Sequence, residues 1–383
     1  MAQLPNPFNP YFPAAGAFFA NRTREQEFFR QGLLQGLHPQ GPGPWNVAVL
    51  GQWGIGKTSL IRRFAEIVGE SEQPTFTVVM TVTSAIAPLP AFCRELLLRV
   101  RDEIRSHERW SNRLRAELDR WEPMLSVGPL RASRRTSSPE PIPAIDLYRE
   151  LRRLWQDHLR SHVAGMVIIL DDAHLLLSHD PTALLTLRGI FQDLQGVGAR
   201  YPLIITGPEG LFEAVRDAAE PVTRFFERMT LGPFSLEDTA QAVRSPLASL
   251  SVPMQVEDQA ISEIWRATGG HPFFVSFAMR DLFQAKGGQG AIGREDVLRS
   301  WPEIVSHLAE ERCASEWGIA TAAERQVLRA LALEDGPSLH QRLGKTSAAL
   351  LPRLVRKGLV LRTGRGEYSL YHPLFAEFVR AQE

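Results

Sequence analysis

The stretch GQWGIGKTSL, residues 51–60, decides the fold because it fits the pattern G-x-x-x-x-G-K-[ST] with Gly51, Gly56, Lys57 and Thr58. It stands between WNVAVL (45–50), a short apolar run typical of a buried strand, and SLIRRFAEIV, whose apolar residues recur at helical spacing. Lys57 is one of only four lysines among 43 basic residues. A strand, a glycine-rich turn and a helix in this order predict a phosphate-binding loop.

Each position in this loop has a physical task. Glycine lets the backbone turn so that successive N–H groups face a phosphate, and the next helix directs the positive end of its dipole at the same anion. Lys57 adds a flexible point charge for the β- and γ-phosphates, where a planar guanidinium would be too wide, and Thr58 can place its hydroxyl on Mg²⁺. The alternative is a glycine-rich turn with a surface lysine. We expect the nucleotide contacts of this loop to come from Gly51, Gly54, Ile55, Gly56, Lys57, Thr58 and Ser59.

The composition is that of a globular protein with two or three domains. The 383 residues are 44% hydrophobic and 22% charged, and 43 acidic residues balance 43 basic ones, so any nucleic-acid contact must come from a local patch. Two distant cysteines, an opening without signal-peptide character and no apolar run of membrane length together predict a cytoplasmic protein without membrane contact.

Apolar strands alternate with helical patterns up to residue 234. This order predicts an α/β fold: a parallel sheet covered by helices on both faces. Helical patterns alone are expected over 235–316, including separate helices at 294–301 and 303–316, so the strands should stop at 235. A proline-, serine- and arginine-rich break is expected at 122–144. The predicted parts are an N-terminal segment that packs on the nucleotide site (1–44), the α/β core (45–234), a helical lid (235–316) and a C-terminal unit (317–383).

VIILDDAH, residues 167–174, gives the acid that a phosphate loop needs on a neighbouring strand. Asp171, at the end of the strand, is expected to hold Mg²⁺, and Asp172 or His174 to polarise the attacking water. The alternative is an acidic strand end that caps the next helix.

Three further residues are candidates for catalysis. Thr206 ends the strand YPLIITG, where its hydroxyl would lie near the γ-phosphate; it can equally be an ordinary β-branched strand residue. Arg224 and Arg228 are candidates for an arginine finger that reaches a neighbouring subunit, or are surface arginines.

Together with RMTLGPFS (228–235) and ATGGHPFFV (267–275), these motifs resemble the AAA+/STAND class of P-loop ATPases, most closely the branch of origin-binding initiators and related prokaryotic signalling ATPases. The resemblance implies ATP and Mg²⁺ as ligands, and lid contacts to nucleotide from Gly270, His271 and Pro272. These residues also read as a helix C-cap followed by a helix start. In FFANRTREQE, Arg22 fits the family's adenine-side element, whereas Asn21 replaces its glycine. Asp172 stands where many members have glutamate, which predicts slow hydrolysis.

The C-terminal unit shows helical patterns at 321–333, 338–343 and 346–360, then two strands within 361–370 and a final helix. This order looks like the winged helix that the family often carries. Seven basic residues and no acid occur within 342–365, which suits phosphate contacts with DNA or an acidic protein partner. The expected contacts are Arg342, Lys345, Arg353, Arg356, Lys357, Arg362 and Arg365. RASRRTSS (131–138) is a second basic element.

These observations lead to the hypothesis of an ATP-dependent switch. It would form homo-oligomers, bind DNA through the winged helix, and recruit or regulate a separate effector protein in mobile-element, defence or replication work. Two alternatives stay open: a signalling ATPase whose C-terminal unit binds only protein, and a nucleotide-binding scaffold with negligible turnover.

Overall fold

The computed structural model describes residues 5–38, 41, 43–107, 118–119, 144–334, 338–339, 347–364 and 366–382. Their contacts divide the chain into two compact units, which we describe separately. The first comprises residues 1–21, 52–56 and 232–383, and the second residues 22–51 and 57–231. The expected basic element 131–138, and nearly all of the expected break at 122–144, lie outside the described residues.

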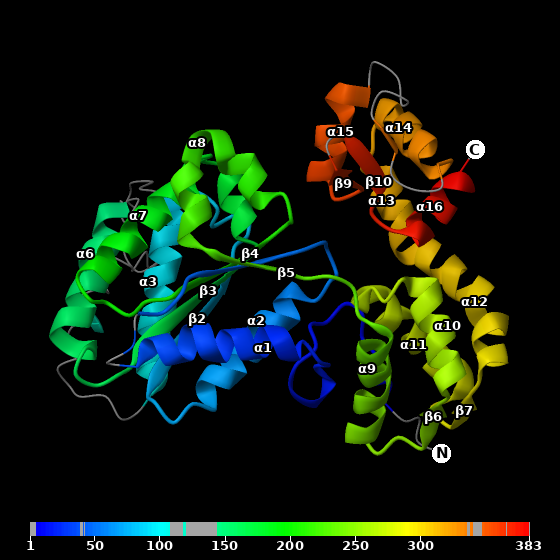
Figure 1. The fold of residues 1–383 in the computed structure, drawn as a ribbon, viewed down its shortest axis with the longest axis horizontal. Coiled ribbons are helices and arrows are strands. Elements are labelled where there is room, and N and C mark those ends of the chain that lie inside the picture. Colours follow the sequence, from blue (N-terminus) through cyan, green and yellow to red (C-terminus); the bar gives the residue numbers. More distant parts are fainter. Residues whose placement is uncertain are drawn as a thin grey trace, which may run out of the picture. The chain divides into compact units, whose positions relative to one another are not determined.

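The second unit is built on a five-stranded parallel sheet with the order β2-β3-β4-β1-β5 (Figure 1). Its strands are β1 Val47–Leu50, β2 Thr75–Thr81, β3 Gly165–Asp171, β4 Leu203–Gly207 and β5 Glu227–Thr230. Its helices are α1 Thr23–Phe29, α2 Lys57–Gly69, α3 Leu89–Ser106, α6 Ala144–Leu154, α7 Ala183–Gly196 and α8 Leu211–Phe225, and the π-helical turn Arg30–Leu34 extends α1. The expected α/β fold class is confirmed.

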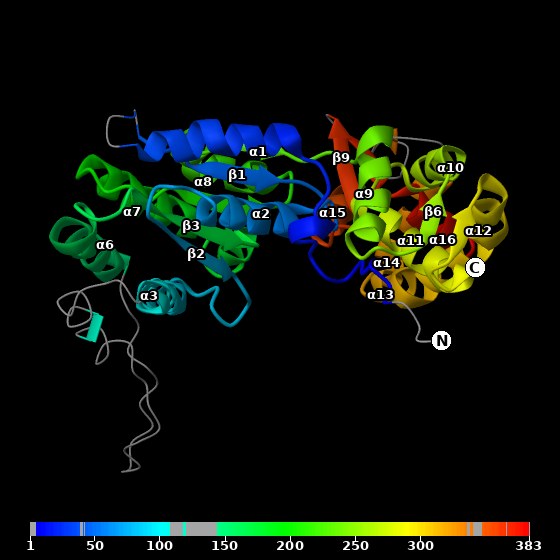
Figure 2. The same ribbon diagram turned by 90° about the horizontal axis from the view of Figure 1, so that it is seen from below.

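Both faces of the sheet are buried, as the uninterrupted apolar strands predict. Ala48 and Leu50 of β1 belong to the core that includes residues of α3, α6 and α7, and the intervening Val47 and Val49 are equally buried. Figure 2 shows α1 and α3 on opposite sides of the sheet. On the α1 side, Phe29 stacks on Phe64 of α2 with ring centroids 4.1 Å apart.

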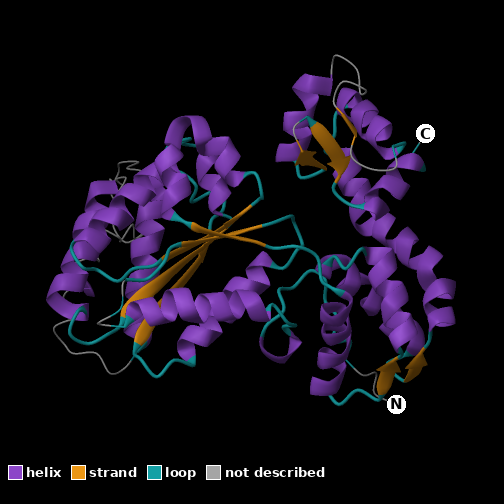
Figure 3. Cartoon of the chain, in the orientation of Figure 1, coloured by secondary structure: helices purple, strands orange, loops and turns teal. Residues whose placement is uncertain are grey.

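The lid region of the first unit contains helices and, unexpectedly, two strands (Figure 3). The prediction that strands stop at residue 235 was wrong, because β6 Met254–Val256 and β7 Gly290–Ile292 form a parallel pair. Met254, Val256 and Ile292 are buried, so these short segments gain burial that their length alone does not signal. The lid helices are α9 Leu236–Ser249, α10 Asp258–Thr268, α11 Pro272–Lys286 and α12 Arg294–Leu308.

Helix boundaries differ from the prediction where proline was taken as a break. Helix α12 runs through Pro302 and continues through Ala309–Cys313 into α13 Ala314–Gly318, so the two expected helices are one. Helix α8 likewise runs through Pro221. Packing of the flanking turns outweighs the hydrogen bond that proline removes.

The C-terminal region has α14 Ala322–Ala332, α15 Ser347–Arg356 and α16 Pro373–Arg380, with an antiparallel sheet of order β8-β10-β9. Its strands are β8 Ser338–Leu339, β9 Val360–Gly364 and β10 Glu367–Leu370. The expected helix at 338–343 is wrong for its first two residues, which form β8, and the rest lies outside the described residues. The helix expected over 346–360 ends at Arg356, because Gly358 turns the chain with φ 73° into β9. The division into four domains stays a prediction.

No helix in the described ranges is long and apolar enough to span a bilayer.

Candidate functional site

Parallel pairing brings the ends of β1, β3 and β4 to one edge of the sheet. Leu50 pairs with Gly207 and Leu170 with Ile205, so the chain leaves all three strands side by side. The N–H of Gly51 donates a hydrogen bond to the carbonyl oxygen of Gly207 over 3.2 Å. Ligands of open parallel sheets bind at this carboxyl edge.

The loop after β1 has the backbone that its glycines allow. Gly54 and Gly56 have φ values of 73° and 98°, in the left-handed region that favours glycine. Helix α2 begins at Lys57, with Thr58 and Ser59 in its first turn, and Ile55 is buried. The positive end of the α2 dipole therefore lies at the loop.

Lys57 holds a cation next to this loop. Its Nζ donates to the carbonyl oxygen of Gly51 over 2.9 Å. Burial lowers the pKa of Lys57, and the charges of Asp172, Asp171 and Glu209 oppose that shift. The resting contact is a neutral carbonyl, which a phosphate oxygen can replace.

Asp171 is the centre of a buried hydrogen-bond network. Its side chain is 3% exposed, and each carboxylate oxygen accepts one hydroxyl. Thr58 donates to Oδ2 over 2.8 Å, and Thr206 donates to Oδ1 over 2.5 Å. The Thr206 hydroxyl also accepts the backbone N–H of Asp172 over 2.8 Å, so Thr206 fixes both acids.

This donor set fits a magnesium ion. A carboxylate and a hydroxyl lie adjacent at the phosphate loop, and Mg²⁺ prefers one or two protein oxygens, phosphate oxygens and waters. Within the described ranges, no group of three or more His, Cys, Asp and Glu residues could hold a metal by itself.

Asp172 and His174 form a second polar pair at the end of β3. Asp172 has φ 55°, a left-handed conformation that turns the chain into the next helical turn. Burial and the charge of Asp171 raise the pKa of Asp172, whereas burial lowers the pKa of His174. His174 Nδ1 lies 3.9 Å from Asp172 Oδ1, close enough for one water to bridge them.

Sequence reasoning missed Glu209, two residues beyond β4. Partial burial raises its pKa, and the charge of Lys57 lowers it. An acid directly after the strand LIITG was the available signal, because it must emerge at the same edge as Asp171.

The remaining α/β candidates are three arginines. Arg22 adopts a left-handed backbone at the start of α1 and forms an ion pair with Glu25 over 3.3 Å. Arg224 is exposed in the last turn of α8. Arg228 is exposed on β5, with its guanidinium 4.6 Å from the centroid of the Phe212 ring.

The lid turn at residues 269–272 has the geometry of a helix end followed by a helix start. Gly269 is the left-handed C-cap of α10, His271 is the N-cap of α11, and Pro272 is its first residue. A Cβ on Gly270 would lie 2.2 Å from the carbonyl oxygen of Phe234, so only glycine fits. His271 is 4% exposed.

The expected DNA contacts divide into three groups. Arg353, Arg356 and Arg362 are exposed. Lys357 is exposed too, and its ammonium donates to Glu324 over 2.6 Å and to the carbonyl oxygen of Ile319 over 2.9 Å. Arg342, Lys345 and Arg365 lie outside the described residues.

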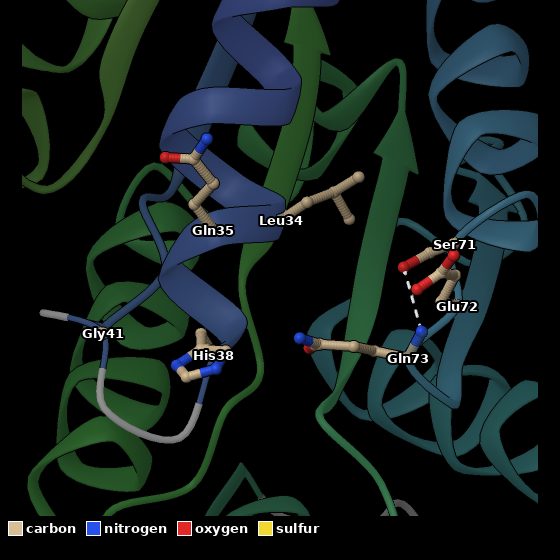
Figure 4. A pocket seen from close by; sticks show the side chains of 7 residues that line it. All are labelled: Leu34, Gln35, His38, Gly41, Ser71, Glu72 and Gln73. Carbon is tan, nitrogen blue, oxygen red and sulfur yellow. Dashed lines mark hydrogen bonds between the residues drawn. The ribbon is translucent and has the colours of Figure 1, made fainter.

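A separate pocket of about 770 Å³ lies near the start of β2, at the sheet edge opposite the phosphate loop (Figure 4). Its lining comes from the turns after α1 and α2, including Gln35, His38, Glu72 and Gln73. It does not contain any residue of the phosphate site.

Comparison with known proteins supports the sequence resemblance over the α/β region. Residues 19–205 match a family model described as an AAA ATPase domain. No curated protein matches the chain.

Two solved structures share the fold across almost the whole chain. The Walker-type ATPase PABY2304 of Pyrococcus abyssi is 14% identical with a TM-score of 0.59, over 94% of this chain and 96% of that one. The ORC2 protein of Aeropyrum pernix is 16% identical with a TM-score of 0.58, over 95% and 96%. The chain thus combines an AAA ATPase domain match at residues 19–205 with a fold that it shares with these two proteins along nearly its full length.

Proposed function

We propose that this protein binds ATP with Mg²⁺ at the edge formed by β1, β3 and β4, hydrolyses it, and works as a nucleotide-dependent switch. The observation that carries the proposal is Thr58 Oγ1 at 2.8 Å from Asp171 Oδ2, next to Lys57 at the start of α2. The glycine-rich loop with its lysine and the strand-end Asp171 thus come together from two separate parts of the sequence. The similar ORC2 structure contains ADPNP and ADP, which supports the same ligand class here.

In this proposal, the groups that bind the triphosphate are already gathered at the carboxyl ends of β1 and β3. The loop amides and the α2 dipole hold the phosphates, and Lys57 Nζ exchanges the Gly51 carbonyl for phosphate oxygens. Thr58 and Asp171 would hold the magnesium ion, which neutralises charge that develops on the β- and γ-phosphates. The two hydroxyls on Asp171 orient its carboxylate before the metal arrives.

Hydrolysis requires a group that orients water opposite the leaving phosphate. We assign this role to Asp172, with His174 as its neighbour. Thr206 fixes the Asp172 backbone through its hydroxyl, so Thr206 positions the acid. The short aspartate side chain fits slow turnover and a long-lived ATP state.

The test is a steady-state phosphate-release assay on the purified protein with Asp171→Asn and Asp172→Asn. Asp171→Asn should lose the dependence on Mg²⁺ along with turnover. Asp172→Asn should retain ATP binding and lose turnover. Equal turnover in Asp172→Asn and wild type would refute the role of Asp172, and binding without any wild-type turnover would favour the scaffold alternative.

The finer proposal is that the C-terminal region is a winged helix that binds duplex DNA. The order α14, β8, α15, β9, β10 supports this architecture, and Arg353, Arg356 and Arg362 are exposed on α15 and β9. ATPase rate with and without duplex DNA separates the alternatives: stimulation supports DNA binding, and an unchanged rate supports a protein partner.

Charge reversal of Arg353 and Arg356 tests the surface itself. The double variant should weaken duplex binding and reduce its salt dependence by about two released ions. Arg266→Glu and Arg299→Glu, at exposed arginines of α10 and α12, would be matched controls outside α15 and β9. If the salt dependence is the same in all variants, this face does not contact DNA.

Assembly is part of the same proposal. We propose that ATP promotes a homo-oligomer in which Arg224 or Arg228 reaches the neighbour's nucleotide, and that a separate effector protein reads this state. Light scattering with a non-hydrolysable ATP analogue should show a mass increase over the nucleotide-free protein. Placement in the cytoplasm and in the STAND branch stay predictions.

A further inference from the structure

Trp53 is an aromatic residue at the tip of the phosphate loop, where the motif accepts any side chain. Trp53 is 49% exposed, yet its ring contacts two side chains, those of Arg312 and Phe273. The guanidinium carbon of Arg312 lies 3.3 Å from the Trp53 ring centroid. The Phe273 ring of α11 meets Trp53 edge-on, with centroids 4.7 Å apart.

The next residue of the loop is equally close to α11. A Cβ on Gly54 would lie 2.9 Å from Phe273 Cβ and 3.1 Å from His271 Cε1. The loop tip, residues 52–56, therefore groups with the lid helices in the first compact unit. Two independent contacts hold the tip: close backbone approach at Gly54 and a cation–π stack at Trp53.

The Arg312 side chain also contacts groups other than Trp53. It forms an ion pair with Glu316, one helical turn later. Glu316 accepts a hydrogen bond from the Tyr371 hydroxyl over 2.7 Å, and Tyr371 is 8% exposed. The guanidinium thus has its counter-charge already and lies over the Trp53 ring.

Tyr371 is followed directly by His372, which begins the C-terminal helix α16. His372 is the N-cap of α16 and is hydrogen-bonded to the carbonyl oxygen of Thr268, the last residue of α10 before the lid turn, over 2.9 Å. Its ring lies 5.6 Å from that of His271, centroid to centroid. The loop tip, the lid turn and α16 are therefore joined by one contiguous set of contacts.

We propose that Arg312 is a positioning residue for the phosphate loop, acting through Trp53 and linking the loop conformation to the C-terminal region; this rests on the proposed ATP site. A glycine-rich loop loses conformational entropy when it orders around a triphosphate. Anchoring Trp53 beforehand lowers that cost, because the loop is already partly ordered when ATP arrives. Arg312 needs no contact with ATP for this effect.

A double-mutant cycle on Mg–ATP affinity, measured by calorimetry, tests the proposal. Arg312→Ala and Trp53→Ala should each weaken binding roughly 3- to 30-fold, the range expected for a cation–π contact. The double variant should bind no more weakly than the weaker single variant, because both remove one interaction. Multiplied effects would overturn the proposal and show that Arg312 touches the nucleotide itself.

Two controls separate positioning from general damage. Arg299→Ala removes an arginine that is 79% exposed on α12 and should leave affinity unchanged. Arg312→Lys retains a cation over the ring and should recover part of the affinity. If Arg312→Ala unfolds the protein, the half-exposed Trp53→Ala still tests the anchor, and wild-type affinity in it would overturn the proposal.

Hydrogen exchange in the nucleotide-free protein gives a readout that does not depend on ATP. Amides 52–56 should exchange faster in Arg312→Ala than in wild type, and at wild-type rates in Arg299→Ala. Unchanged exchange at these amides overturns the positioning role. Faster exchange in a protein that binds no nucleotide would refute the proposed ATP site and leave the anchor standing.

Discussion

The sequence predicts a phosphate contact for two lysines, Lys57 in the α/β unit and Lys357 in the C-terminal region. In the structure the two ammonium groups have different partners. Lys57 Nζ rests on a neutral carbonyl oxygen, among acids that act on it through space. Lys357 Nζ rests on the carboxylate of Glu324, whose side chain is 3% exposed. The ion pair with Glu324 gives Lys357 a part in the fold, and its contact with DNA stays a prediction.

The largest contrast should come from removing Lys57. We expect Lys57→Ala to weaken Mg–ATP binding by roughly a hundredfold, since hydrogen bonds from a charged group contribute about 1.5–3 kcal/mol each. Competition with a fluorescent ATP analogue measures the loss. Lys57→Arg should fail almost as badly, because a planar guanidinium does not match a point-charge site. If Lys57→Ala binds Mg–ATP with wild-type affinity, the phosphate loop is not the ATP site.

Acid should destabilise the C-terminal region through His372. Burial lowers the pKa of His372 from 6.5 to about 4, and Nδ1 accepts the N–H of Leu374 over 3.1 Å, so the ring is neutral when folded. The unfolded chain therefore binds the proton more readily. The stabilisation is complete above pH 6.5 and is lost as pH falls towards 4, by about 3 kcal/mol.

Thermal unfolding followed between pH 7.5 and 4.5 measures this loss. His372→Asn retains an acceptor for the N–H of Leu374 at the N-cap, loses the bond to Thr268 and cannot titrate, so its unfolding temperature should change less with pH. An identical pH profile in the variant and wild type would exclude His372 as the source.

Removing Lys357 should affect stability and leave the nucleotide site intact. Lys357→Ala leaves the buried carboxylate of Glu324 without this cation, although it still accepts the N–H of Thr321. We expect the variant to lower the free energy of unfolding by roughly 2 kcal/mol, between the values for exposed and buried pairs. Calorimetric unfolding is the measurement, with ATP affinity as the matched comparison to Lys57→Ala. If Lys357→Ala has normal stability and binds DNA more weakly, Lys357 contacts DNA as the sequence predicts.

The last expected effect is a pH dependence of Mg–ATP affinity that comes from Lys57. Burial lowers the pKa of Lys57 in the nucleotide-free protein, and bound phosphates would raise it again. Affinity is therefore complete below the lowered pKa, and above it decreases with rising pH by at most about tenfold per unit, because binding takes up one proton. Calorimetry on the wild-type protein from pH 7 to 10 tests this, and an affinity that does not change over this range would contradict it.

Sequence alone predicted the sheet edge because its signals are local. A glycine pattern, an acid pair at the end of an apolar strand and a threonine at the end of another each mark one strand end, and parallel pairing then brings Lys57, Asp171 and Thr206 together. Nothing in this reasoning required a long-range contact to be known in advance.

The C-terminal and lid regions depend on partners far apart in the sequence, which no local pattern shows. The pairs Lys357–Glu324, Arg312–Trp53 and His372–Thr268 span 33 to 259 residues. The short strands β6 and β7 depend on each other in the same way. Counting basic residues within 342–365 could not reveal that one of them was already engaged.

Calorimetric titration of the full-length wild-type protein with Mg–ATP, beside Lys57→Ala and Lys357→Ala, tests the central claim most directly. The account predicts saturable heat for wild type and for Lys357→Ala, and none at the same concentrations for Lys57→Ala. A folded wild-type protein that gives no heat with Mg–ATP, or a Lys57→Ala variant that binds as wild type does, would contradict it.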